Sequence, residues 1–167
     1  MKVKDLMTVK VRTVSPEDKI DRVFFFMNFE QIRHIPVVEK GKVVGILSDR
    51  DLKKVFGSLK MNEINALNDN QQMVYTVKSR MVRTIMRRGV ITIHPLAEAY
   101  EAAAVMAKRK IGALPVVKNE KLVGIISATD ILRAFVKLTS SSDSLIKQTD
   151  KSPGLSSSRI FQKAKLK

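Results

Sequence analysis

One stretch of this sequence occurs twice, and the repetition constrains the fold more than any other feature. An apolar-Pro-Val-Val run, a short turn and a Gly-Ile-x-Ser-x-x-Asp run fill residues 35–51 and recur at 114–130. The pairs related by the same offset of 79 positions include Pro16 and Pro95, Pro36 and Pro115, Gly45 and Gly124, Asp51 and Asp130, and Phe56 and Phe135. Residues 3–56 and 82–135 are therefore two gapless copies of one unit. Each copy is too short to bury a good core alone, so we expect the copies to pack face to face and share one core.

Each copy predicts the order strand, helix, strand, strand, helix, after a short helical turn. In the first copy the predicted elements are a turn at 4–7, a β-branched strand at 11–14, a helix with an apolar stripe at Ile20, Val23, Phe24 and Met27, strands at 35–38 and 43–47, and a second helix from residue 49. In the second copy the helix stripe is Ala99, Ala102, Ala103 and Met106. This order predicts an α/β (α+β) fold in which two repeats pack as a pseudo-twofold pair.

The predicted boundaries follow the repeat. Residues 1–57 form the first repeat, 58–81 a helical connector, and 82–138 the second repeat. The segment 139–167 is rich in Ser and in basic residues, a composition typical of a flexible tail.

The charge balance is strongly basic, with 31 Lys and Arg against 16 Asp and Glu and a formal net charge of +15. A polyanion partner would explain it, and so would charges that are simply solvated. Aromatic residues make up only 5% of the chain and none alternates with a basic cluster, so nucleic acid is not the partner that we expect. The absence of cysteine excludes disulfides and thiolate chemistry, and it fits the cytoplasmic location that we expect. No apolar run approaches the ~18 residues of a membrane span, so we expect no membrane insertion.

The twin units, each with an apolar-Pro-Val-Val strand and a Gly-Ile-x-Ser-x-x-Asp turn, resemble a tandem cystathionine-β-synthase (CBS) domain pair over residues 3–136. The connector length and the run at 129–136 look most like stand-alone bacterial pairs of the acetoin-utilisation type. The resemblance implies binding of an adenosyl ligand, with AMP, ADP or ATP expected first and NAD or S-adenosylmethionine as alternatives. It also implies a homodimer in the form of a flat disc and an unknown regulated partner.

The residues support nucleotide binding independently of that resemblance. An Asp in the first turn of a helix, beside a strand end, accepts both hydroxyls of a ribose, and Asp51 and Asp130 are placed for this. Ser48 and Ser127 stand three residues earlier, and the helix N-terminus is expected to add free N–H groups. The alternative is structural, because Ser-x-x-Asp before an apolar run is also a helix-capping pattern.

The predicted nucleotide-binding residues are Thr13, Val14, His34, Pro36, Ser48, Arg50 and Asp51 in the first copy, and Thr92, Ile93, Ala113, Pro115, Ser127, Thr129 and Asp130 in the second. Arg33, Arg87 and Arg88 are candidate phosphate contacts, although Arg87 and Arg88 fit a solvated pair equally well. The first copy has Arg33, His34 and Arg50 around its predicted site, where the second has Gly112, Ala113 and Thr129. This asymmetry predicts unequal affinities, with the first copy better suited to phosphate charge.

Two aromatic residues of the first copy lie off the core stripe of their helix. At 100° per residue, Phe25 and Phe29 face away from the apolar stripe, which predicts a dimer interface; a broad stripe that meets the connector is the alternative. His34 and His94 lack a second His or any Cys nearby in sequence, so no metal site is expected. Neither a nucleophile elbow nor a Gly-rich phosphate loop occurs, so we expect no enzyme activity.

The leading hypothesis is a non-catalytic regulatory module that binds a nucleotide in a cleft between the copies. The alternatives are a basic scaffold for nucleic acid or another polyanion, which predicts steep salt dependence, and an assembly module with no nucleotide site.

Overall fold

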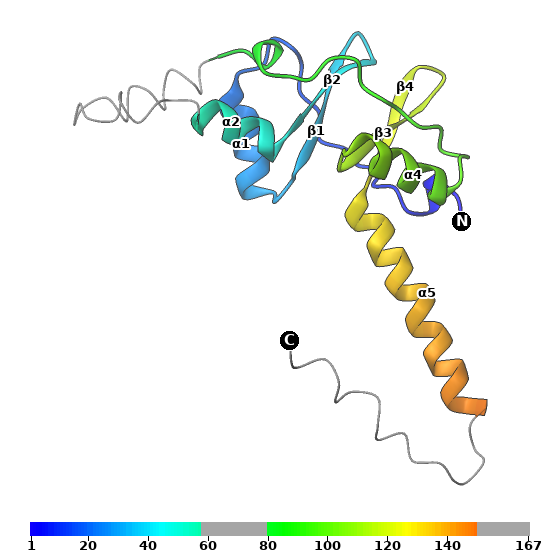
Figure 1. Cartoon of the computed structure of the whole chain (residues 1–167). Coiled ribbons are helices and arrows are strands. Elements are labelled where there is room, and N and C mark those ends of the chain that lie inside the picture. The colour runs from blue at the N-terminus through cyan, green and yellow to red at the C-terminus, as the bar shows by residue number, and fades with distance from the viewer. Residues whose placement is uncertain (58–79, 150–167) are drawn as a thin grey trace. The chain divides into compact units, whose positions relative to one another are not determined.

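The computed structural model describes residues 1–57 and 80–149, and in these ranges the two copies form the same series of elements (Figure 1). The first copy contains η1 (Val3–Asp5), α1 (Ile20–Phe29), β1 (His34–Glu39), β2 (Lys42–Ser48) and α2 (Asp49–Gly57). The second contains η3 (Val82–Thr84), α4 (Ala99–Arg109), β3 (Ala113–Lys118), β4 (Lys121–Ser127) and α5 (Ala128–Thr149). The predicted α+β class with two repeated units is confirmed. Most of the predicted connector, at 58–79, and the tail from 150 lie outside the described residues.

The last helix, α5, continues to Thr149, into the Ser-rich segment that begins at residue 139. Hydroxyl groups of this segment bond back to the helix. Thr139 Oγ1 donates to the carbonyl of Phe135 at 3.1 Å, and Ser140 Oγ donates to that of Val136 at 2.8 Å. Ser and Thr side chains that bond back to the preceding turn are compatible with a helix, so a Ser-rich composition does not by itself end one.

Each copy contributes one antiparallel hairpin, shown in cyan and yellow in Figure 1. Ile35 pairs with Leu47 in the first hairpin, and Leu114 pairs with Ile126 in the second. Both hairpins shift register at the same place, which leaves one extra residue in β2 and one in β4. The two central residues of each turn have positive φ, among them Gly41 at 79° in the first copy. Such turns match the right-handed twist of the flanking strands.

The strand predicted at 11–14 is reduced to a single parallel bridge between Val14 and Val37, and Ile93 makes the equivalent bridge to Val116. Val14 N donates to the Pro36 carbonyl, and Val38 N donates to the Val14 carbonyl. The next bonds of a parallel ladder would need the N–H of Pro36 on one side and of Pro16 on the other. Proline has no N–H, so the ladder stops after one residue in both directions.

The first residues of the two repeats are exchanged between the copies. We call residues 2–8 and 81–87 the leading segments. Val3 N donates to the Ala97 carbonyl at 2.9 Å, and the equivalent Val82 N donates to the Asp18 carbonyl at 2.8 Å. Further along, Thr8 exchanges both backbone hydrogen bonds with Ile125 of β4. Each leading segment therefore adds a bridge to the hairpin of the other copy.

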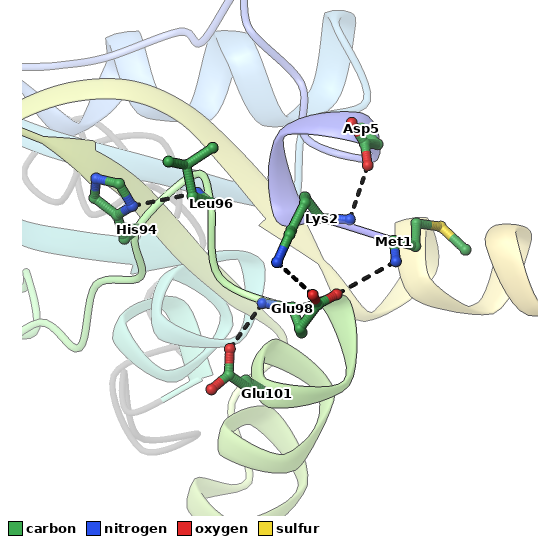
Figure 2. A network of polar contacts seen from close by, with 7 residues as sticks. All are labelled: Met1, Lys2, Asp5, His94, Leu96, Glu98 and Glu101. Atoms are coloured by element: carbon green, nitrogen blue, oxygen red, sulfur yellow. Dashed lines mark hydrogen bonds and ion pairs between the residues drawn. The ribbon is translucent and has the colours of Figure 1, made fainter.

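Charged groups hold the first leading segment at the start of α4 (Figure 2). Figure 2 shows Met1 and Lys2 directed at the carboxylate of Glu98, which pairs with the Met1 amino group at 3.3 Å and with Lys2 Nζ. Glu98 N in turn donates to Glu101 Oε2 at 2.7 Å. The hydrogen bond from Lys2 is the main reason why the pKa of Glu98 is lowered.

The exchange corrects the expectation of one shared core, because the apolar residues form two clusters. The cluster of the first copy contains Ile20, Ile35 and Leu47 and is completed by Val82, with Ile85 and Met86 packed against it. The cluster of the second copy includes the buried Val3, with Leu6 and Met7 packed against it. Each repeat is too small to close its own core, and the leading segment of the other repeat supplies the missing apolar side chains.

A glycine in each hairpin makes room for the exchanged segment. A Cβ atom on Gly45 would lie 2.7 Å from Met86 Sδ, and one on Gly124 would lie 2.6 Å from Met7 Sδ. The second site is tighter, because that Cβ would also lie 3.0 Å from the carbonyl oxygen of Thr8. A methionine side chain can rotate away, whereas the Thr8 backbone is held by its bonds to β4.

We therefore expect Gly124→Ala to cost about 1–3 kcal/mol of unfolding free energy, as overpacking of a core does, and Gly45→Ala to cost less. Urea denaturation of the two variants measures the difference, and Gly45→Ala serves as the matched control. Equal losses would contradict the proposed role of the Thr8 carbonyl.

Candidate functional site

A cleft of about 740 Å³ is lined by residues of both copies. Its walls come from the start of β1, the first turn of α2, the end of the second leading segment with the residues up to 91, the end of α4 and the first turns of α5. Nine of the predicted site residues line it, namely Arg33, His34, Ser48, Arg50, Asp51, Arg87, Arg88, Ala113 and Thr129.

Asp51 is the buried acidic group of this cleft, with 8% of its surface exposed. Its Oδ2 accepts hydrogen bonds from Ser48 N at 3.0 Å and from Ser48 Oγ at 2.6 Å. Its Oδ1 accepts one from Arg87 Nε at 2.9 Å. Burial by itself raises the pKa of Asp51, but the hydrogen bonds from Ser48 and Arg87 outweigh it, and the net pKa lies below the ordinary 3.8. The carboxylate is thus kept ionised in a polar pocket.

The capping interpretation of Ser-x-x-Asp is confirmed in both copies. Ser127 N and Ser127 Oγ donate to Asp130 Oδ2 at 2.8 and 2.6 Å, as Ser48 does to Asp51. The expected free N–H groups are partly used, because Asp49 N donates to the Arg33 carbonyl at 3.1 Å. Capping and ligand binding are compatible roles for a carboxylate that has two oxygens.

His34 and Arg33 reach across to the second copy. His34 lies against Gly112, where an added Cβ would be 2.9 Å from His34 Nε2. Arg33 Nη2 donates to Thr129 Oγ1 at 2.6 Å. The pKa of His34 lies below 6.5, mainly because the side chain is buried and, next, because of the positive charge of Arg33. A neutral His34 therefore stabilises the fold above pH 6.5, and this stability is lost as the pH falls through the lowered pKa of the folded state.

The residues that were predicted to flank two sites meet in this one cleft. Arg33, His34 and Arg50 of the first copy and Gly112, Ala113 and Thr129 of the second all line it. The unequal affinity of two sites stays a prediction. The exchange of leading segments turns the equivalent edges of the two copies toward each other, which a comparison of aligned positions does not reveal.

The lining of the cleft is basic on balance. It includes Arg33, Arg50, Arg87, Arg88 and Lys110, against the acidic Asp49 and Asp51. Basic groups in a partly enclosed space favour an anionic ligand, because low-dielectric walls strengthen their attraction for it.

The other predicted nucleotide-binding residues lie outside the lining of this cleft. Val14, Pro36 and Pro115 are buried, and Val14 and Ile93 make the single bridges to the hairpins. The remaining residues of this group are Thr13, Thr92, Ser127 and Asp130. Their roles toward a ligand stay predictions.

Several lining residues were not identified from the sequence. Val90, Ile91, Met106 and Leu132 form an apolar part of the wall, and Lys110 contributes a further cation. Ile91 and Leu132 are exposed apolar residues, but exposure is visible only in the structure. Lys110 ends α4 in a left-handed conformation, and nothing in its sequence context singles it out.

Phe25 and Phe29 lie on the exposed face of α1, as the helix periodicity predicts. Their rings stack at 4.9 Å between centroids and are 50% and 75% exposed, whereas Ile20, Val23 and Met27 are buried. The pair is thus an exposed aromatic patch.

These observations define a class of protein: two α+β repeats that exchange their leading segments and enclose a basic, carboxylate-bearing cleft. The chain belongs to the CBS domain family, since the family model for the CBS domain matches residues 3–58 and 82–137.

Relatives and solved structures agree with this assignment. The CBS domain-containing protein YhcV of Bacillus subtilis is 32% identical over 129 residues, which cover 77% of this chain and 81% of YhcV. A Vibrio cholerae protein assigned to acetoin utilization (AcuB) has a TM-score of 0.67 at 28% identity, over 92% of this chain and 98% of that one. The likeness to acetoin-utilisation pairs is thereby confirmed.

A third similar structure carries ligands. The CBS domain pair of protein MJ0100, in complex with 5-methylthioadenosine and S-adenosyl-L-methionine, has a TM-score of 0.67 at 27% identity, over 82% of this chain and 97% of that one. Other relatives are longer: the chain spans 39% and 46% of two Methanocaldococcus jannaschii proteins. Among the helices of residues 1–57 and 80–149, none is long and apolar enough to cross a membrane.

The environment of Asp51 predicts a pH-dependent contribution to stability. Because its folded pKa is lowered, the stabilisation is fully present above pH 3.8 and is lost as the pH falls through the folded pKa. Asp51→Asn lacks the ionised carboxylate and therefore this stabilisation. The difference in unfolding free energy between the wild type and Asp51→Asn is thus expected to become smaller as the pH falls below 3.8. Urea midpoints across a pH series measure this difference, with Asp21→Asn as the exposed control. A difference of constant size at all pH values would contradict the prediction.

Proposed function

We propose that this chain is a non-catalytic regulatory module that binds an adenosyl ligand in the cleft between its two repeats and communicates binding to a partner protein. The observation that carries the proposal is the carboxylate of Asp51, held at the start of α2 in a cleft whose other charged groups are mostly basic. AMP, ADP and ATP are the ligands that we place first, with NAD and S-adenosylmethionine as alternatives.

The lining matches the three parts of such a ligand. Ribose hydroxyls donate to the Asp51 carboxylate, and guanidinium groups such as Arg50 and Arg88 pair with phosphate oxygens. The apolar wall at Ile91 and Met106 offers contact to the adenine ring. Support for the adenosyl class also comes from the ligands of the MJ0100 pair. The preference for a phosphorylated ligand depends on the basic lining alone.

Communication follows from the elements that line the cleft. Thr129 and Leu132 belong to the first turns of α5, and Asp51 belongs to that of α2. A ligand that contacts both helices favours whichever arrangement of the two repeats gives it the better contacts, and it shifts the population by that difference in affinity. A partner that recognises one arrangement then responds to the ligand.

The first test is thermal unfolding and calorimetric titration with AMP, ADP, ATP, NAD, S-adenosylmethionine and a short DNA duplex. We expect AMP to raise the unfolding midpoint of the wild type, because a ligand that binds only the folded state stabilises it by mass action. Asp51→Asn removes a charged acceptor and is expected to weaken AMP binding about 10- to 100-fold, equivalent to about 1.5–3 kcal/mol.

Asp130→Asn is the matched control, since Asp130 makes the same capping contacts but does not line this cleft. AMP binding that is weakened in Asp51→Asn and retained in Asp130→Asn would place the ligand at Asp51. Binding that is weakened only in Asp130→Asn would place it in the second repeat. No response to any nucleotide, together with a salt-sensitive response to the duplex, would replace the proposal with the polyanion scaffold.

We also propose that the chain forms a homodimer through the Phe25–Phe29 patch. Two stacked, exposed aromatic rings offer apolar area that a second copy would remove from water. Association of CBS pairs through such helices is what the family resemblance implies.

The double variant Phe25→Lys with Phe29→Lys is expected to sediment as a monomer at concentrations at which the wild type is dimeric. Val9→Lys with Leu96→Lys, which alters two other exposed apolar residues, is the control and is expected to stay dimeric. A dimeric Phe25/Phe29 variant would show that the interface lies elsewhere.

A further inference from the structure

The Asp51 carboxylate has too few open acceptor positions for a ribose diol as it stands. A carboxylate offers about four lone-pair positions on its two oxygens. Ser48 N and Ser48 Oγ occupy Oδ2, and Arg87 Nε occupies one position of Oδ1. Two hydroxyls that donate together to this carboxylate therefore require one of the present donors to leave.

Of these donors, Arg87 is the one that a ligand can most readily displace from the Asp51 carboxylate. The Ser48 contacts are local to the start of α2 and recur unchanged between Ser127 and Asp130, so they belong to the capping of each helix. The Arg87 contact instead joins two distant segments. The side chain of Arg87 is half-exposed (53%), whereas that of Asp51 is 9% exposed.

The backbone of Arg87 stays in place when its side chain moves. Arg87 N donates to the Ile46 carbonyl at 3.0 Å, and Ile46 N donates to the Arg87 carbonyl at 3.1 Å. In residues 1–57 and 80–149, the acidic partner found for Arg87 is Asp51, bound through Nε. The other carboxylate of the lining, Asp49, pairs with Lys53 at 3.6 Å. The side chain can therefore change its rotamer within the cleft while the backbone hydrogen bonds to Ile46 remain.

A displaced guanidinium in this cleft needs a new anion. Arg33, Arg50, Arg88 and Lys110 already make the lining basic, so Arg87 would add to an unbalanced positive charge after losing Asp51. A neutral nucleoside supplies hydroxyls to Asp51 but nothing to Arg87. A nucleoside that carries a phosphate supplies both, because its oxygens accept from a guanidinium.

From these contacts we infer that Arg87 is a specificity-determining residue. Its side chain blocks the Asp51 carboxylate until a ligand displaces it, and we call this role the guard. The ribose diol displaces Arg87 from the carboxylate, and only an anionic group on the same ligand pairs the released guanidinium. The cleft thus selects phosphorylated adenosines over adenosine itself. This inference depends on the proposed function and deepens it.

The guard is particular to one copy. The position equivalent to Arg87 in the first leading segment is Thr8, which is uncharged. Thr8 makes the same backbone bridge, to Ile125, that Arg87 makes to Ile46. The two leading segments are therefore alike in backbone and different in the side chain that the guard requires.

The test compares adenosine with AMP by calorimetric titration of wild type, Arg87→Ala and Arg88→Ala. Removal of Arg87 frees Asp51, which strengthens the binding of both ligands, and removes an anion contact from AMP alone. A charged hydrogen bond contributes up to about 100-fold in affinity, so for AMP the lost contact outweighs the gain and the two net effects have opposite signs. We expect Arg87→Ala to bind adenosine about 10-fold more tightly than the wild type and AMP about 10-fold more weakly, as loss of a charged hydrogen bond implies.

Arg88→Ala removes the same charge from the same cleft but does not touch Asp51. It is expected to weaken AMP without improving adenosine, which separates the guard from general charge in the cleft. Circular dichroism and urea midpoints establish that both variants are folded.

Each outcome decides the inference. Opposite changes for adenosine and AMP in Arg87→Ala support the guard. Binding of AMP to the wild type with adenosine affinity unchanged or weakened in Arg87→Ala overturns the guard and leaves the proposed function intact. Binding of S-adenosylmethionine alone overturns the guard but not the proposed function. Failure of the wild type to bind any of AMP, ADP, ATP, NAD and S-adenosylmethionine overturns both.

Discussion

The reciprocal backbone hydrogen bonds of the two leading segments are the interaction on which the rest of this structure depends. Val3 bonds to the turn before α4, and Val82 bonds to the equivalent turn before α1. Each segment then adds a bridge to the hairpin of the other copy and completes its apolar cluster. Two units that are individually too small for a stable core become one compact body because each closes the other.

The cleft is a consequence of that exchange. Arg87 is the last residue of the second leading segment, and its bridge to Ile46 places it beside Asp51 of the first copy. Arg33 and His34 in turn meet Thr129 and Gly112 of the second copy. Residues that lie far apart in the chain thus surround one space, and a ligand in it contacts both repeats at once. Such shared contact is the physical requirement for a module that converts ligand binding into a change of arrangement.

The sequence predicted the repeated elements well because their signals are local. The helix stripe at Ile20, Val23 and Met27, the hairpins and the capping of both helices all depend on residues a few positions apart. The exchange and the two separate cores were not predicted, because a periodic pattern shows which residues are buried but not against which copy. The shortened strand is different. Its cause, prolines 16 and 36, is visible in the sequence once the parallel register is known.

The candidate site, like the fold, was predicted where its signals are local and missed where distant elements meet. Ser48, Asp51 and the arginines were identified by residue type and spacing, whereas the apolar wall at Ile91 and Met106 comes from elements that the sequence does not connect. The six residues that were assigned to two sites are three equivalent pairs, and all of them line this one cleft. Alignment by the 79-residue offset pairs these positions but does not show that the fold brings them together.

A single repeat could reach this arrangement only as a symmetric dimer in which two chains swap their first residues. In such a dimer every residue occurs twice, so a guanidinium beside one Asp would also stand beside the other. Joining the two halves in one chain removes that restriction. It allows Arg at position 87 and Thr at position 8, and His at 34 against Ala at 113. Covalent linkage therefore does more than raise the local concentration of the halves: it lets one pseudosymmetric scaffold place different side chains at equivalent positions.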